Sequence, residues 1–122
     1  MSRKIYIVED HPAMRAAYAQ LFFHLSDLEL CGTASCGEEA LAQIPICQPD
    51  LVLVDLSLPR MSGFDLIGQL RNIQPTLPLL VVSGHDRSAF PRHQLETGVQ
   101  EYVMKSDGPH ALVCSIRRVL AA

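Results

Sequence analysis

The 122-residue chain lacks tryptophan, contains few aromatic residues (6%) and has no large excess of charge of either sign. Its 10 basic and 13 acidic side chains give a net charge of −3 with neutral histidines. A mildly acidic domain has no overall field that attracts phosphate backbones, so we expect no direct binding of nucleic acid by this domain. A hydrophobic content of 48% also excludes intrinsic disorder, which requires low hydrophobicity and high net charge.

Cysteine pairs and long apolar runs are absent as well. The four cysteines form no C-x-x-C pair and no spacing typical of metal ligands, which favours small core residues in a reducing compartment. The apolar run near the N-terminus, Ile5–Val8, is far shorter than the ~7–15-residue apolar region of a signal peptide. The other apolar runs are too short to span a membrane. We therefore expect a cytoplasmic protein that does not bind membranes.

The chain does contain a regular alternation of short apolar runs and segments with helical spacing. A run such as Leu51–Val54 has no polar alternation, which is typical of a parallel strand covered by helices on both faces. Five such runs predict five strands: Ile5–Val8, Leu28–Thr33, Leu51–Val54, Leu79–Val82 and Glu101–Met104.

Start and stop signals between these runs predict five helices. The first helix should run from Pro12 to about Leu25, and the second should open with a Ser35–Glu38 capping box and end before Pro45. The third should run from Ser62-Gly63 to before Pro75. The fourth should start late, near Pro91, with Gly98 as its cap, and the fifth should start at Pro109. Strands alternating with helices in a chain of this length predict one domain, residues 1–122. Its fold would be α/β, a single doubly wound five-stranded parallel sheet with five helices.

Polar residues follow the apolar runs at the edge where such a sheet binds its ligands. Glu9 and Asp10 follow the first run, Asp55 the third, Ser83 the fourth and Lys105 the fifth. Carboxylates gathered at one edge repel each other, since two unit charges 4 Å apart interact with roughly 4 kcal/mol at an effective dielectric constant near 20. A divalent cation relieves this repulsion, and oxygen donors in small number suit Mg²⁺, with Mn²⁺ as a plausible substitute. A carboxylate in such a site can also accept a phosphoryl group as an aspartyl-phosphate.

Six segments in this order resemble the receiver domain of bacterial two-component response regulators over essentially the whole chain. The resemblance implies a flavodoxin-like fold with receiver topology and a phosphorylation-controlled signalling function. The segments are Ile7-Val8-Glu9-Asp10-His11-Pro12, Ala34–Leu41, Asp50–Asp55, Leu58-Pro59-Arg60-Met61-Ser62-Gly63, Val81-Val82-Ser83-Gly84 and Glu101-Tyr102-Val103-Met104-Lys105.

The resemblance implies a metal site and an acceptor. Asp55 would accept a phosphoryl group from a sensor histidine kinase or a phosphotransfer protein. Asp10, Asp55 and the backbone carbonyl of Ser57 would bind Mg²⁺ directly, and Glu9 would act through water. Beyond its own phosphoryl transfer and dephosphorylation, such a domain is not an enzyme.

The resemblance also implies a switch. Ser83 would move to the phosphoryl oxygens, Lys105 would pair with them, and Tyr102 would rotate inward behind the hydroxyl. Ser83 as an ordinary turn hydroxyl and Tyr102 as a half-buried packing residue remain the alternatives. His11 and His85 fall on the same edge, and we hypothesise that Ser57 and His85 tune hydrolysis of the acyl phosphate.

Two departures from the family pattern are Gly84, where alanine is frequent, and Ser106, where proline is frequent. The segments after the first and fifth runs look most like those of receivers that precede a LuxR-type helix-turn-helix, which implies transcription regulation through an effector domain absent from this chain. The chain is then either a fragment or a stand-alone receiver. An apolar excess on the last helix is explained either by ordinary core packing or by a surface for a phosphorylation-dependent homodimer or for effector docking. That surface would involve the fourth helix, fifth strand and fifth helix or the first and fifth helices.

Three other functions fit the sequence less well. A haloacid-dehalogenase-like hydrolase generally needs a second aspartate two residues after the nucleophile, where this chain has Ser57. An FMN carrier needs a phosphate loop after the first strand, and Glu9-Asp10 would repel that phosphate. A receiver fold kept only as a binding module would not need the acceptor, acidic pair, hydroxyl and lysine together.

Overall fold

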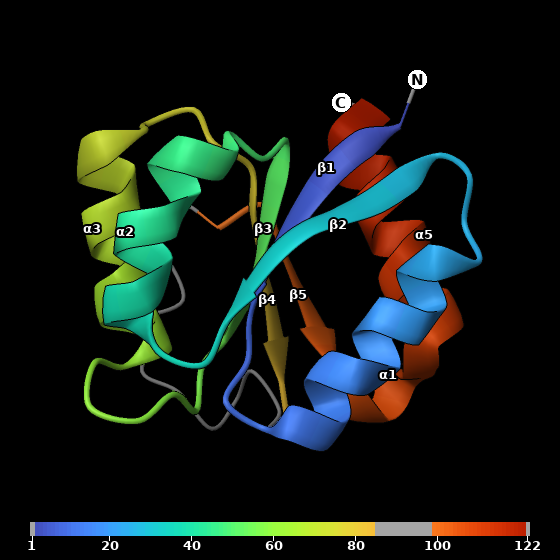
Figure 1. Cartoon of the computed structure of the whole chain (residues 1–122), viewed down its shortest axis with the longest axis horizontal. Coiled ribbons are helices and arrows are strands. Elements are labelled where there is room, and N and C mark those ends of the chain that lie inside the picture. Colours follow the sequence, from blue (N-terminus) through green and yellow to red (C-terminus); the bar gives the residue numbers. More distant parts are fainter. Residues whose placement is uncertain (1, 85–98, 122) are drawn as a thin grey trace.

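The computed structural model describes residues 2–84 and 99–121. Five parallel strands form one sheet in the order β2-β1-β3-β4-β5. Helices α2 and α3 cover one face of the sheet, and α1 and α5 cover the other (Figure 1). The strands are β1 (Arg3–Val8), β2 (Leu28–Ala34), β3 (Leu51–Asp55), β4 (Leu79–Ser83) and β5 (Glu101–Met104), and the helices are α1 (Pro12–Phe23), α2 (Gly37–Cys47), α3 (Gly63–Ile73), the 3₁₀ turn η2 (Lys105–Asp107) and α5 (Gly108–Ala121).

Each strand divides its side chains between two cores, as its alternating directions require. On β1, Ile5 and Ile7 pack with α1 and α5, whereas Tyr6 and Val8 pack with α2 and α3. All four are essentially inaccessible to water. The predicted burial of the sheet on both faces is therefore confirmed, and the fold is the predicted doubly wound α/β sheet.

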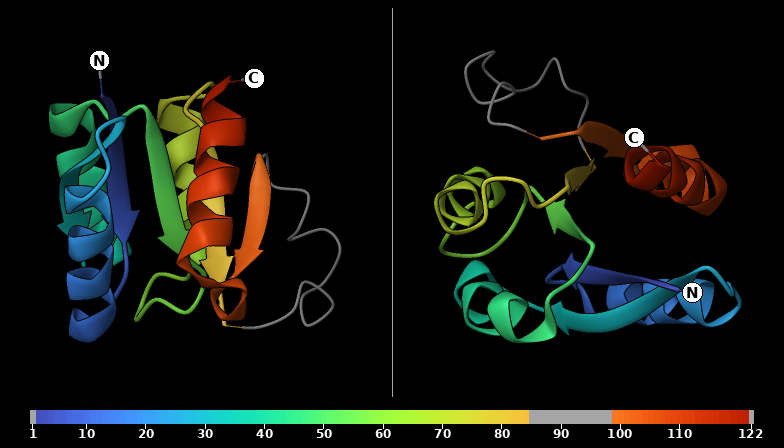
Figure 2. Two further views of the ribbon diagram at one scale, coloured as in Figure 1. Left: turned by 90° about the vertical axis from the view of Figure 1, so that its right-hand side faces the viewer. Right: turned by 90° about the horizontal axis from the view of Figure 1, so that it is seen from above.

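Connections from β1 and β3 leave the sheet in opposite directions, because β2 lies on one side of β1 and β3 lies on the other. A crevice forms at such a switch point, beyond the carboxyl ends of the strands. The start of β1 and the end of α5 lie at the opposite edge (Figures 1 and 2). The crevice is thus formed by the β1–α1 and β3–α3 connections.

Helix α2 differs from its prediction at both ends. It begins at Gly37, its N-cap is Cys36 and no side chain caps it, so the predicted Ser35–Glu38 capping box is wrong. Gly37 is buried against Met61, where an added Cβ would lie 2.7 Å from the sulfur, so the first turn packs closely against this side chain. The helix also continues through Pro45 to Cys47, because Ile44 is fully buried and Gln48 closes the last turn with a left-handed backbone (φ 51°).

The other helices follow the sequence closely. Ser62 caps α3 by accepting a hydrogen bond from the Asp65 backbone N–H, and α5 starts one residue before Pro109. The predicted fourth helix near Pro91, with its cap Gly98, lies outside the described residues, as does His85. Four α-helices are present in the described ranges, none of them long and apolar enough to cross a membrane.

The cysteine prediction holds only in part. Cys31, Cys36 and Cys47 are half-buried, and burial raises the pKa of the Cys31 thiol to about 11. Cys114 is exposed on α5, so it is not a core residue.

Candidate acidic site at the switch point

The end of β1 carries the two acidic residues into the crevice. Glu9 is 1% exposed, and its backbone is fixed at the sheet because its N–H donates to the Ala34 carbonyl over 2.9 Å. The next residue, Asp10, is more accessible, with 28% of its side chain exposed. Pro12 then starts α1, so the turn between strand and helix is short and places both carboxylates at one edge.

Asp55 ends β3 beside this pair and is 2% exposed. Its Oδ1 accepts a hydrogen bond from the Ser57 backbone N–H over 3.0 Å. Its Oδ2 lies 3.2 Å from the Lys105 ammonium group, which also lies 3.0 Å from Glu9 Oε1. One cation from the end of β5 therefore bridges two buried carboxylates from β1 and β3.

Electrostatics at the site follow from this packing. Burial raises the pKa of Glu9, and the neighbouring Asp55 raises it further, against the lowering effects of Lys105 and His11. Burial alone would lower the pKa of Lys105, but the carboxylates of Glu9 and Asp55 hold it above its ordinary value. Burial therefore disfavours the charged form of Glu9, whereas the two carboxylates favour the charged form of Lys105.

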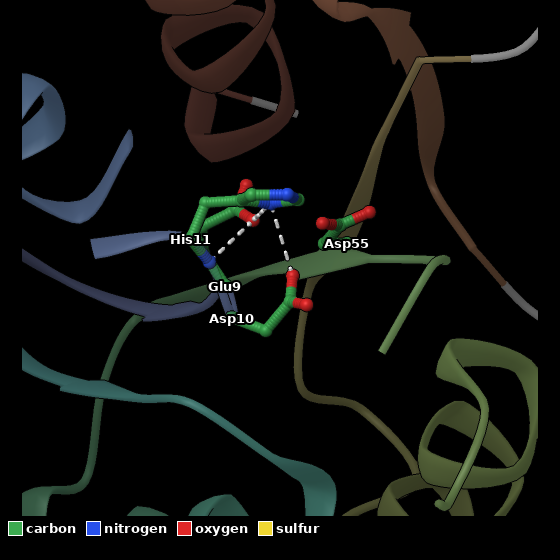
Figure 3. A group of neighbouring side chains, drawn as sticks. All are labelled: Glu9, Asp10, His11 and Asp55. Atoms are coloured by element: carbon green, nitrogen blue, oxygen red, sulfur yellow. Dashed lines mark hydrogen bonds and ion pairs between the residues drawn. The ribbon is translucent and has the colours of Figure 1, made fainter. Parts of the chain in front are cut away.

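A fourth side chain joins the acidic residues. His11 Nδ1 lies 3.1 Å from Glu9 Oε2 and 3.2 Å from Asp10 Oδ1 (Figure 3). Glu9, Asp10, His11 and Asp55 each offer one donor atom, and these atoms lie within 4.8 Å of one another. Glu9 Oε1 and Asp10 Oδ1 are buried oxygens, and their close partners among the described residues are Lys105 and His11. This group could hold a metal ion, since a divalent cation would satisfy both oxygens and offset the clustered charge.

The remaining predicted residues lie at the same edge or near it. Ser83 ends β4, is 4% exposed and pairs in register with Met104 of β5. Tyr102 lies on β5, half-buried against the core that α2 and α3 cover. The Ser57 side chain is exposed beside Asp55.

His11 lies on the predicted edge, but the sequence alone does not identify it as a possible metal ligand, and two supporting residues, Arg15 and Tyr18, have no predicted role at all. Arg15 donates from Nη1 to the Glu9 carbonyl over 2.9 Å and so ties α1 to the end of β1. Tyr18 lies buried beneath the site, and burial followed by the charges of Glu9 and Asp55 raises the pKa of its phenol. Their spacing from Pro12 on one helix face is the signal that could have identified them.

Comparisons with known proteins agree with this arrangement. Residues 5–117 match the family model described as the response regulator receiver domain. The chain is 30% identical over 118 residues to the response regulator GacA of Pseudomonas aeruginosa, and 28% identical over 121 residues to the virulence regulator BvgA of Bordetella pertussis. These alignments cover 97% and 99% of this chain but 55% and 57% of the relatives, so the chain spans little more than half of their length.

A solved structure is similar over nearly the whole chain. The LuxR-family two-component response regulator from Aurantimonas sp. SI85-9A1 superposes with a TM-score of 0.91 at 30% identity, covering 99% of this chain and 86% of that one. Fold, acidic crevice and family match therefore agree, and the chain belongs to the response regulator receiver domain family.

Proposed function

We propose that this receiver accepts a phosphoryl group on Asp55 from a phosphohistidine of a sensor histidine kinase or phosphotransfer protein. The observation that carries the proposal is the position of Lys105, whose ammonium group approaches both Glu9 and Asp55 at the switch point of the sheet. One oxygen of Asp55 accepts a hydrogen bond from the Ser57 backbone N–H, and the other lies beside the Lys105 ammonium group.

The proposed transfer is a nucleophilic displacement at phosphorus. An oxygen of Asp55 forms the new P–O bond while the P–N bond of the donor breaks, and the leaving imidazole regains a proton. Lys105 offsets the negative charge that the phosphoryl group brings, and the Ser57 backbone N–H holds the acceptor carboxylate in place.

Asp10, Asp55 and the backbone carbonyl of Ser57 would hold Mg²⁺, with Glu9 acting through water. The donor set fits the ion, because hard oxygen ligands at one open edge suit a cation that keeps several waters. When bound, Mg²⁺ neutralises charge on the transferred group. Mn²⁺ would serve as a substitute.

A conformational readout would follow phosphorylation through Ser83 and Tyr102. Ser83 lies at the end of β4, close enough in the fold for its hydroxyl to reach a group on Asp55 after a local shift, since Asp55 pairs in register with Val82. Tyr102 lies on the neighbouring strand, so movement of the β4 end leaves space that its ring can enter. Ser57 and His85 would tune the rate at which the acyl phosphate is hydrolysed, and replacement of both should change that rate.

The output would be transcription regulation through an effector domain, as in the regulators that this chain resembles, together with a phosphorylation-dependent homodimer. On the described surface, Phe23 at the end of α1 is 83% exposed and lines a shallow apolar hollow with Ala16 and Ala19 of the same helix, which supports a contact through α1. Sedimentation with and without beryllofluoride tests this part, and a monomer under both conditions would count against it.

Incubation with acetyl phosphate and Mg²⁺ tests the acceptor. Intact mass should show a gain of one phosphoryl group in the parent, no gain in Asp55→Asn and an unchanged gain in Asp65→Asn, an exposed control on α3. A parent that gains no phosphoryl group from acetyl phosphate or from a phosphohistidine donor would leave only a receiver fold used for binding.

A further inference from the structure

The imidazole of His11 lies beside Glu9 and Asp10 and faces their carboxylates (Figure 3). Its Nδ1 is 3.1 Å from Glu9 Oε2 and 3.2 Å from Asp10 Oδ1. Its backbone N–H also donates to Glu9 Oε2 over 3.3 Å, so the backbone and the ring of His11 both contact the same carboxylate oxygen. The ring therefore has a defined place among the donor atoms although 66% of the side chain is exposed.

The start of α1 explains this orientation. His11 is the N-cap of the helix with extended backbone angles (φ −85°, ψ 117°), and its side chain makes no capping hydrogen bond. A capping side chain would turn toward the first helical N–H groups. The imidazole turns toward Glu9 and Asp10 instead, at the position where a metal ion would meet their carboxylates.

The separations fit a coordination sphere. Metal–oxygen and metal–nitrogen bonds of ~2.0–2.2 Å place adjacent ligands of an octahedron ~3 Å apart and opposite ligands ~4.2 Å apart. The four donor atoms lie within 4.8 Å of one another, so small side-chain rotations bring them to these distances. The buried Glu9 side chain faces the ring through Oε2, 3.1 Å from Nδ1, while its Oε1 pairs with the Lys105 ammonium group at 3.0 Å.

We propose that His11 Nδ1 is an additional metal ligand and gives this receiver a preference for a first-row transition-metal ion, Mn²⁺ or Co²⁺, over Mg²⁺. The inference rests on the proposed function, which places a divalent metal at Asp10 and Asp55. Imidazole nitrogen is a good ligand for transition metals, whereas Mg²⁺ favours oxygen ligands and water. Adding one nitrogen to an oxygen site therefore strengthens transition-metal binding selectively.

Electron spin echo envelope modulation of bound Mn²⁺ tests the nitrogen directly. The parent should show modulation from a coordinated ¹⁴N, and His11→Ala should lose it. His24→Ala removes an exposed histidine at the other end of α1 and should keep the signal. This readout does not depend on phosphorylation, and loss of a merely structural contact would not abolish it while Mn²⁺ stays bound.

Calorimetric titration supplies the second measurement. His11→Ala should weaken Mn²⁺ binding by ~10-fold or more, since loss even of a group that only orients a ligand costs about 10–100-fold, and change Mg²⁺ binding by less than ~3-fold. Absence of nitrogen modulation in the parent, or equal changes for both ions in His11→Ala, would overturn the inference.

The acceptor assay separates this result from the proposed function. If Asp55 gains a phosphoryl group with Mg²⁺ while no nitrogen binds Mn²⁺, the function stands and the His11 ligand is wrong. If Asp10→Asn leaves the binding of both ions unchanged, the proposed metal site itself fails, and the His11 inference fails with it.

Discussion

Glu9 is a carboxyl group that is almost completely buried beside a second carboxylate and an ammonium group. Burial and Asp55 raise its pKa, which means that the folded state binds the Glu9 proton more tightly than the unfolded state does. The contribution of Glu9 to the free energy of unfolding therefore falls as pH rises from the ordinary carboxyl value of 4.5 to the higher folded value. At neutral pH without a metal ion, the charge of Glu9 destabilises the fold.

Glu9→Gln should consequently raise the melting temperature of the metal-free protein at pH 7–8 and flatten its dependence on pH. The shift should reach several degrees, because ~1 kcal/mol changes the melting temperature of a domain this size by roughly 3–6 °C. Thermal unfolding followed by circular dichroism in EDTA measures it. Glu29→Gln, an exposed change on β2, is the matched control and should leave the melting temperature nearly constant. A lower melting temperature for Glu9→Gln would show that the ion pair with Lys105 outweighs the repulsion.

Gly63 has no side chain, and this allows the start of α3 to approach the end of β3 closely. A Cβ built on Gly63 would lie 2.7 Å from the Asp55 carbonyl and from Leu56 Cα, both backbone atoms that cannot rotate away. The Gly63 N–H also donates to the Leu56 carbonyl over 3.3 Å. The N-terminus of α3 thus holds the segment that carries the proposed acceptor.

Gly63→Ala should destabilise the fold by roughly 1–3 kcal/mol, the usual cost of overpacking. It should also slow acetyl-phosphate labelling, since relief of the clash moves the Asp55–Ser57 segment. Gly68→Ala is the control on the same helix, where an added Cβ meets nothing within 4 Å, and should be neutral or stabilising. Urea unfolding of the two variants, with labelling rates at equal folded fraction, makes the comparison. Equal stability in both variants would contradict the argument.

At the scale of elements, Arg71 joins the end of α3 to two strands. Its guanidinium donates to the carbonyls of Gln74, Pro75 and Leu77 and to Gln100 Oε1, which also accepts from the Leu79 N–H. One side chain therefore satisfies carbonyls of the α3–β4 connection and fixes the start of β5 beside β4. Burial lowers the pKa of Arg71, in keeping with its partly enclosed position.

Arg71→Lys should destabilise the fold nearly as much as Arg71→Ala, by roughly 1–3 kcal/mol, because an ammonium group in the place of Nη1, beside the three carbonyls, cannot also reach Gln100 Oε1, which Nη2 binds. Urea unfolding measures the loss. Arg60→Lys, an exposed change in the β3–α3 connection, serves as the control. If Arg71→Lys is as stable as the parent, the positive charge, and not the planar arrangement of donors, stabilises the α3–β4 connection.

The sequence predicted the elements that depend on local signals and missed those set by packing. Strand positions and the Ser62 cap follow from apolar runs and a short-range hydrogen bond, and both are confirmed. The ends of α2 depend on contacts with Met61 and on burial of Ile44, which no local pattern encodes, so the capping box and the stop before Pro45 were wrong.

The candidate site shows the same division. Strand ends give the edge residues Glu9, Asp10, Asp55 and Lys105 directly, because parallel strands end together. The orientation of the His11 ring depends on the short turn into α1 and on competition between capping and the carboxylates. The orientation of the His11 ring therefore could not be predicted from the sequence.

At the scale of the molecule, an ion pair between residues 90 positions apart joins α5 to the turn before β2. Arg117 donates from Nε to Asp27 Oδ2 over 2.8 Å and from Nη2 to Oδ1 over 3.0 Å. Arg117 lowers the pKa of the Asp27 carboxyl. A lowered folded pKa adds stability above the ordinary carboxyl pKa, and this contribution is lost as pH falls through the folded value.

Arg117→Gln should return the Asp27 pKa to its ordinary range, measured by NMR titration of the carboxyl carbon. Because both side chains are about half exposed, the melting temperature at pH 7 should barely change. Arg118→Gln, which breaks a neighbouring pair with Glu101, should leave Asp27 unaffected. A large fall in melting temperature for Arg117→Gln would show that the pair holds α5 in place, contrary to the weak contribution expected of exposed ion pairs.

Metal binding should stabilise the whole fold, because the carboxylates that bind the ion come from β1 and β3 and are brought together only when the sheet has formed. Mg²⁺ at 100 times its dissociation constant should raise the free energy of unfolding by about 2.7 kcal/mol. Asp10→Asn should remove this gain at the same concentration, whereas Glu38→Gln on the exposed surface of α2 should retain it. Urea unfolding with and without Mg²⁺ measures the difference. If Asp10→Asn gains as much stability from Mg²⁺ as the parent, the ion binds elsewhere, and Lys105 must relieve the repulsion at the switch point without a metal ion.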